Sequence, residues 1–192
     1  PAGYSMHQVS RRSDKGGGGV AVVYKNTMGF AEIPTLSFTT FEYLDAKFKN
    51  PGGTPIRMVV LYRPPSNNTN LVEVVILDKS TLIITGDFNY HVDDISDANA
   101  ASFLSLLKDL GLHQHVKTPT HEKGHILDLI VTRESESLVG NIEIDRSVYS
   151  DHFTVMADLS IAQPRLATRN ISIRKWSNLN LDKFKRNLKR RE

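Results

Sequence analysis

Short runs of apolar or alternating residues recur along most of this 192-residue chain. Eight of them are too short for helices and predict strands, at residues 20–24, 31–33, 41–48, 56–62, 80–85, 126–131, 141–144 and 153–159. Residues 99–110 favour a helix with Ala101, Leu104, Leu107 and Leu110 on one face and Gly111 after its end. Residues 71–77 favour a second, short helix. Many strands with few helices indicate an α+β sandwich, with the sheets inside and the helices outside.

The composition is that of a globular domain, with 40% hydrophobic and 23% charged residues. The chain has no cysteine, which excludes a disulfide framework, a cysteine nucleophile and a thiolate zinc site. No apolar stretch approaches the roughly 18 residues of a membrane span, so no membrane association is expected. No signal peptide is visible either. These features favour an intracellular location.

The charge is distributed unevenly around a boundary that we place at Gln163-Pro164. Residues 165–192 carry ten lysines and arginines against two acids, a net charge of +8, which leaves −5 for the other 164 residues. We therefore expect a main domain over 1–163 and a basic linker and helix over 164–192. Such a tail suits a polyanion, with Lys183, Arg186 and Arg190 as candidate nucleic-acid contacts. A solvated helix would explain the same charges.

The motif Gly86-Asp87-Phe88-Asn89 directly follows one of the apolar runs. In an extended segment Asp87 and Asn89 point to the same side, because side chains alternate along a strand. A carboxylate and a carboxamide at the mouth of a sheet suit a divalent cation and a phosphate. The same residue types also form turns, so the motif alone equally fits a strand-ending turn.

A second polar motif, Ser150-Asp151-His152, precedes the run at 153–159. Asp128 lies within an apolar strand and needs a partner, because a lone buried carboxylate is costly; His152 is the natural one. A serine-hydrolase triad at 150–152 is excluded, since consecutive strand residues face opposite ways. A zinc site lacks a scaffold among five of the other histidines, His91, His113, His115, His121 and His125.

Four segments therefore occur in a fixed order: residues 61–65 (LYRPP), 86–89 (GDFN), 127–130 (LDLI) and 150–152 (SDH). This order resembles the endonuclease/exonuclease/phosphatase superfamily, which includes exonuclease III and pancreatic deoxyribonuclease. The Arg-Pro-Pro after Tyr62, the Thr-Pro-Thr-His at 118–121 and the basic continuation are similar to the endonuclease domain of non-LTR (LINE-type) retrotransposons. The resemblance spans about residues 3–160 and implies a four-layer α/β/β/α sandwich, followed in the full protein by a reverse transcriptase.

The resemblance also implies roles for individual residues in phosphodiester hydrolysis. Asp87 would orient and deprotonate the attacking water, and His152, held by Asp128, would donate to the phosphate. The remaining implied contacts are Asn89 and Tyr62 on the phosphate, Asp151 on Mg²⁺ (with Mn²⁺ as the alternative) and Arg63 on DNA.

One expected feature is missing from these residues. Members of the superfamily carry an early Asn and then a Glu that is the principal magnesium ligand, whereas the first acid here is Asp14. Residues 3–12 resemble the stretch that follows that Glu. We therefore expect a domain that lacks its first strand or strands and this metal ligand.

Two functions remain open at this point. The first is a magnesium-dependent DNA endonuclease that nicks a target site and acts in the nucleus, leaving a 3′ hydroxyl to prime reverse transcription. The second is a catalytically inactive remnant that binds nucleic acid or a partner through its basic tail. A phosphomonoesterase or lipid-phosphate hydrolase is disfavoured by the YRPP segment and the basic extension.

Overall fold

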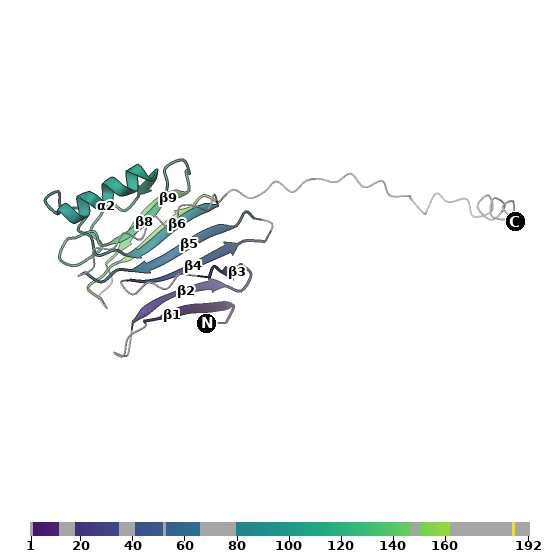
Figure 1. Ribbon diagram of the computed structural model, residues 1–192. Helices are drawn as coiled ribbons and strands as arrows, with labels where there is room; N and C mark the ends of the chain where they lie inside the picture. Colours follow the sequence, from purple (N-terminus) through teal and green to yellow (C-terminus); the bar gives the residue numbers. More distant parts are fainter. Residues whose placement is uncertain are drawn as a thin grey trace.

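The structure is a computed structural model that describes residues 2–11, 18–34, 41–51, 53–65, 80–146, 150–161 and 186. These residues form ten strands and a 12-residue helix. In chain order they are β1 (Tyr4–Ser10), β2 (Gly19–Lys25), β3 (Gly29–Glu32), β4 (Glu42–Lys49), β5 (Ile56–Tyr62), β6 (Thr81–Asp87), α2 (Ala98–Asp109), β7 (Leu112–Gln114), β8 (Asp128–Arg133), β9 (Val139–Asp145) and β10 (Thr154–Leu159) (Figure 1).

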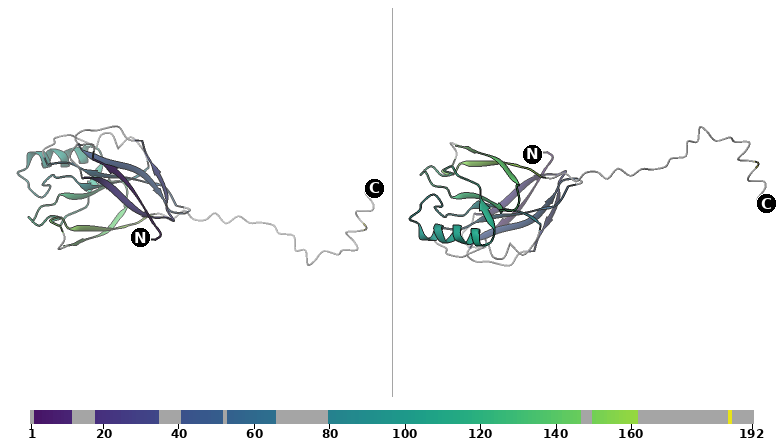
Figure 2. Two further views of the ribbon diagram at one scale, coloured as in Figure 1. Left: turned by 90° about the horizontal axis from the view of Figure 1, so that it is seen from below. Right: turned by 90° about the horizontal axis from the view of Figure 1, so that it is seen from above.

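A six-stranded sheet in the order β3-β4-β5-β6-β8-β7 forms the centre of the fold. Strands β5 and β6 run parallel, and the other neighbouring pairs are antiparallel. The α2 helix covers one face of this sheet, and the two-stranded sheets β1-β2 and β9-β10 lie over the other (Figure 2). The described residues thus form the sheet-rich α+β sandwich that the sequence predicts. In this part of the chain no helix is long and apolar enough to cross a membrane.

The middle strands are apolar on both faces because both faces are covered. On one face Leu82 and Ile84 of β6 are at most 1% exposed, and on the other Ile83 of β6 is 3% exposed and Ile130 of β8 7%. The run at 80–85 was therefore correctly predicted as a buried strand. The strand continues two residues beyond that run, so that its last residue is Asp87.

The α2 helix begins and ends close to its predicted bounds. The Asp97 side chain caps its start by accepting from the backbone N–H groups of Asn99 and Ala100. Gly111, with φ of +64°, follows its end, and its N–H donates to the carbonyl of Lys108.

The predicted buried face of this helix is partly wrong. The buried residues are Ala100, Phe103 and Leu107, whereas Leu104 is 37% exposed. The Phe103 ring stacks on Tyr90 with 4.6 Å between centroids, and this aromatic contact turns the helix so that Phe103, rather than Leu104, faces the sheet.

Other differences concern segments with weak patterns. Strand β1 lies before the first predicted strand, and β7 lies between the predicted helix and the run at 126–131. The predicted helices at 71–77 and 181–191 and the boundary at 163–164 fall outside the described residues, Arg186 excepted. The division into two regions therefore stays a prediction.

A buried ion pair joins β4 and β5 inside the sheet. Asp45 is 4% exposed and Arg57 9%, and the Arg57 Nε lies 3.0 Å from Asp45 Oδ1 and 3.2 Å from Oδ2. Such a pair contributes little when compared with apolar residues, but loss of one partner leaves a buried charge without its counter-charge.

Replacement of Asp45 alone should therefore lower the free energy of unfolding more than replacement of both residues. We expect Asp45→Ala to lower the free energy of unfolding by about 3 kcal/mol, and Asp45→Ala/Arg57→Met to lower it by less than that. Urea unfolding followed by circular dichroism measures both. A double variant less stable than Asp45→Ala would show that the charge of Arg57 does not depend on Asp45.

Candidate active site

Three predicted site residues lie in one row across neighbouring strands. Tyr62 of β5 is in register with Asp87 of β6, and Asp87 is in register with Asp128 of β8. Residues in register point to the same face of a sheet. That face is the one covered by β1-β2 and β9-β10, because Tyr62 packs with Val20, Val22 and Leu44.

Gly86 allows β5 and β6 to approach at this row. Its φ is +135°, and a Cβ at this position would lie 1.9 Å from the carbonyl oxygen of Leu61. No other residue fits this backbone. The glycine of the GDFN motif is thus structural, and it fixes the end of β6 where Asp87 stands.

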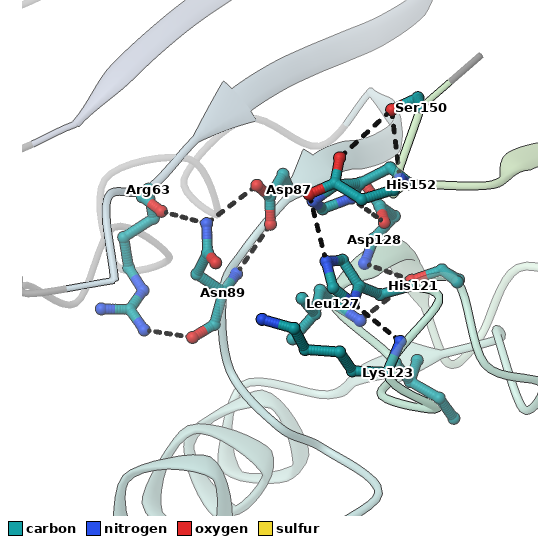
Figure 3. Close-up of polar contacts among 12 residues, drawn as sticks. Arg63, Asp87, Asn89, His121, Lys123, Leu127, Asp128, Ser150 and His152 are labelled. Atoms are coloured by element: carbon teal, nitrogen blue, oxygen red, sulfur yellow. Dashed lines mark hydrogen bonds and ion pairs between the residues drawn. The ribbon is translucent and has the colours of Figure 1, made fainter.

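Asn89 reaches Asp87 through a turn and not through strand alternation. Its φ of +50° is left-handed, so the extended geometry expected from the sequence is wrong at this residue. The Asn89 N–H donates to Asp87 Oδ1 at 3.0 Å and its Nδ2 donates to Oδ2 at 2.8 Å (Figure 3). The two side chains do lie on the same side, held by these hydrogen bonds. The amide oxygen of Asn89 is not used in either bond.

His152 is paired with Asp128, as the position of Asp128 in an apolar strand led us to expect. Its Nδ1 lies 2.8 Å from Asp128 Oδ2 (Figure 3). A carboxylate only accepts, so Nδ1 carries a proton and Nε2 is the nitrogen left for a substrate. Partial burial opposes the charged ring, but the hydrogen bond and the charge of Asp128, followed by the charges of Asp87 and Asp151, outweigh it and raise the pKa of His152.

The pKa of Asp87 is also raised. Burial is the largest cause and the negative charge of Asp128 the second, and together they outweigh the hydrogen bonds from Asn89 and the attraction of His152. A carboxylate with a raised pKa is a stronger base once it is ionised. Asp87 therefore combines a fixed orientation with the basicity needed to take a proton from water.

A second histidine, His121, meets the site from the turn before β8. Its ring lies edge-on to that of His152 with 4.9 Å between centroids, and the two residues form an isolated β-bridge. The backbone N–H of Lys123 donates to His121 Nδ1 at 3.1 Å, so the neutral ring carries its proton on Nε2. That nitrogen lies 3.5 Å from Asp151 Oδ2. His121 is thus placed to donate to Asp151.

Sequence reasoning left His121 among loop histidines without a role. The available signal was its place in Thr-Pro-Thr-His, seven residues before Asp128. Two sets of ligand atoms cluster here, one from Asp87, Asp128 and His152 and one from His121, Asp151 and His152. The proton on His121 Nε2 argues against His121 as a metal ligand, because a ligating nitrogen needs a free lone pair.

The carboxylates fit a magnesium ion better than a zinc ion. The Asp151 side chain is 61% exposed. Although burial opposes its charge, its own backbone N–H, His152 and His121 lower its pKa, so it is anionic at neutral pH. Mg²⁺ is held by one or two carboxylates together with water and phosphate oxygens. Asp151 offers such oxygens, whereas the oxygens of Asp87 accept from Asn89 and Asp128 is engaged by His152.

The predicted nucleic-acid contacts are placed less favourably. Arg63 is only 6% exposed and lies beneath the GDFN turn. Arg186 is exposed, whereas Lys183 and Arg190 lie outside the described residues. Contact of these residues with DNA stays a prediction.

The fold and the family can now be stated. The structure matches the endonuclease domain of TRAS1, a telomere-specific non-LTR retrotransposon, at a TM-score of 0.64 and 19% identity, over 80% of this chain and 76% of that one. It also matches an endonuclease/exonuclease/phosphatase family protein from Bacteroides thetaiotaomicron (TM-score 0.55, 18% identity, 82% and 73% covered). A mannosyl-6-phosphatase from the same organism matches at 0.54 and 17% identity, with 82% and 77% covered.

The sandwich is therefore that of the endonuclease/exonuclease/phosphatase superfamily. Within it, residues 56–156 match the family model of endonuclease-reverse transcriptases, and the chain belongs to this family. The matched range contains Tyr62, the GDFN motif, Asp128 and His152. A search of the curated proteins found no match.

The close approach at Gly86 predicts a large effect of a single methyl group. We expect Gly86→Ala to lower the free energy of unfolding by roughly 2–4 kcal/mol, because it adds a backbone clash to an unfavourable φ. The matched control is Gly111→Ala, where φ is +64° and no atom lies within 4 Å of the new Cβ. That variant should lose only about 1 kcal/mol. Equal losses in urea unfolding would contradict a role for the contact with Leu61.

The Asp128 pair predicts the titration of His152. In an NMR titration of the imidazole signals, we expect the pKa of His152 to lie above the ordinary value of about 6.5 and to fall in Asp128→Asn. Because the folded pKa is the higher one, the pair should stabilise the fold fully below pH 6.5 and lose this contribution as pH rises through the folded pKa. Asp109→Asn, at the far end of α2, is the control that should leave the titration unchanged. An unchanged His152 pKa in Asp128→Asn would disprove the assignment.

Proposed function

We propose that this chain is the DNA endonuclease domain of a retroelement-encoded protein, which hydrolyses a phosphodiester with the help of Mg²⁺ or Mn²⁺. The observation that carries the proposal is the convergence of Asp87, Asn89, Asp128 and His152, from three separate segments, in a chain of the endonuclease-reverse transcriptase family. A nick that leaves a 3′ hydroxyl suits the priming of reverse transcription, and chromosomal DNA as the target would place the protein in the nucleus.

Asp87 is the general base of this mechanism. Its carboxylate accepts two hydrogen bonds from Asn89, which fix its orientation, and its raised pKa favours proton transfer from a bound water. The water oxygen forms a bond to phosphorus, the bond from phosphorus to the 3′ oxygen breaks, and the 3′ oxygen takes up a proton from a solvent water, to which Asp87 in turn releases the proton it accepted. The products are a 5′ phosphate and a 3′ hydroxyl.

The phosphate is bound by groups around this base. His152, protonated against Asp128, donates from Nε2 to a phosphate oxygen and stabilises the charge that develops there. Tyr62 stands in the same row as Asp87, where its hydroxyl can donate to the phosphate. Asp151 is the carboxylate that would hold the cation, which would supply positive charge next to the phosphate and the leaving oxygen.

DNA is the substrate class that the rest of the chain favours. The net charge of +8 at residues 165–192 suits a nucleic-acid backbone and offers nothing specific to a small phosphate ester. The TRAS1 neighbour is by its description an endonuclease domain of a retrotransposon. The mannosyl-6-phosphatase neighbour has the same fold, so a monoester substrate belongs in the test.

Nicking of a supercoiled plasmid tests the proposal. With Mg²⁺ present we expect open-circle product with ends that a DNA polymerase extends, and loss of at least 100-fold in rate for Asp87→Asn and His152→Gln. Asp145→Asn, an exposed carboxylate at the end of β9, is the matched control and should retain the rate.

Three outcomes would count against the proposal. Absence of nicking together with DNA binding through the tail would favour the inactive binding module. Hydrolysis of p-nitrophenyl phosphate without nicking would favour a phosphomonoesterase. Nicking that survives both active-site substitutions would show that the site lies elsewhere.

A further inference from the structure

Arg63, the arginine of the YRPP segment, is built into the turn that carries Asn89. It directly follows β5, and its backbone N–H donates to the carbonyl oxygen of Asp87 at 2.9 Å. Only 6% of the residue is exposed. A residue this buried, with a permanent positive charge, needs acceptors inside the protein.

The acceptors are the backbone carbonyls of the motif itself. Arg63 Nε donates to the carbonyl oxygen of Phe88 at 2.6 Å, and a terminal guanidinium nitrogen donates to that of Asn89 at 2.8 Å. In return, Asn89 Nδ2 donates to the carbonyl oxygen of Arg63 at 2.8 Å (Figure 3). The guanidinium carbon also lies 3.7 Å from the centroid of the Tyr90 ring, a cation–π contact.

This arrangement accounts for the unusual backbone of Asn89. A φ of +50° is unfavourable for a residue other than glycine and persists only where its surroundings fix it. The planar fork of Arg63 binds two successive carbonyls, so it fixes the peptide between Phe88 and Asn89. Lysine carries the same charge but presents a single flexible ammonium group, which cannot reproduce the fork.

We propose that Arg63 is a positioning residue, which holds Asn89 and, through the hydrogen bonds of Asn89, the carboxylate of Asp87 in the orientation needed for hydrolysis. The inference rests on the proposed function and adds a residue to the same site. Arg63 then supports the reacting groups and does not contact DNA, because its nitrogen donors face the protein backbone and the residue is buried.

Arg63→Lys distinguishes positioning from DNA contact, since it keeps the charge and removes the fork. We expect kcat for plasmid nicking to fall by about 10- to 100-fold, with KM for DNA and its dependence on salt changed by less than twofold. Arg146→Lys, a substitution of an exposed arginine after β9, is the matched control and should leave kcat unchanged. A raised KM and a flatter salt dependence, with kcat retained, would make Arg63 a DNA contact and overturn the proposal.

A double-variant cycle tests whether Arg63 acts through Asn89. Glycine tolerates the left-handed backbone, so Asn89→Gly removes the side chain and the need for the fork together. We expect Asn89→Gly to slow nicking, and the addition of Arg63→Lys to slow it by less than twofold more. Full multiplication of the two effects would contradict the inference. The glycine background also keeps the test available if Arg63→Lys alone is too unstable to assay.

An NMR readout separates this inference from the proposed function. The two Asn89 side-chain amide protons are held by Asp87 Oδ2 and by the Arg63 carbonyl, so their signals should be shifted and slow to exchange; the Asn89→Gly spectrum assigns them by their absence. We expect Arg63→Lys to collapse both signals toward those of a free amide. Unchanged signals would overturn the positioning role even in an active enzyme. If the wild-type chain does not nick DNA but Arg63→Lys still collapses the Asn89 signals, the proposed function is wrong and the role of Arg63 in holding Asn89 stands.

Discussion

The register of three neighbouring strands is the constraint on which the site depends. Tyr62, Asp87 and Asp128 share a row, and a slip of one residue in any of the three strands would turn that side chain to the face covered by α2. Gly86 contributes to this register because only glycine permits the contact with Leu61. Asn89, which donates to Asp87, and His152, which pairs with Asp128, are then both placed by hydrogen bonds made from this row.

The sequence predicted which residues come together better than it predicted how they are held. Apolar runs at 56–62, 80–85 and 126–131 marked all three strands, and polar residues within them or at their ends lie together in the structure. The pairing of Asp128 with His152 followed from a physical argument that needs no structure, since a carboxylate in an apolar strand requires a partner. These predictions succeeded because they used local pattern and the cost of buried charge.

Other features depend on contacts between distant segments and were not accessible from the sequence. Arg63 gave the signal of an exposed cation, yet the carbonyls that bind it come from residues 25 and 26 positions away. The φ of Asn89 and the proton on His121 Nε2 are likewise set by neighbours. The rotation of α2 that brings Phe103 to face the sheet arises from the stacking of Phe103 on Tyr90. In each case, a tertiary contact overrode the local pattern.

Thr120 has a wider consequence for how such a domain can change over time. It is fully buried, and its hydroxyl oxygen accepts the N–H groups of both Leu127 and Asp128 at 3.0 Å. Its carbonyl accepts the N–H of Phe153, beside His152. One small residue thus anchors both partners of the histidine–carboxylate pair to the same point. Surface loops that make no contact with Thr120 can then vary in sequence without moving Asp128 or His152.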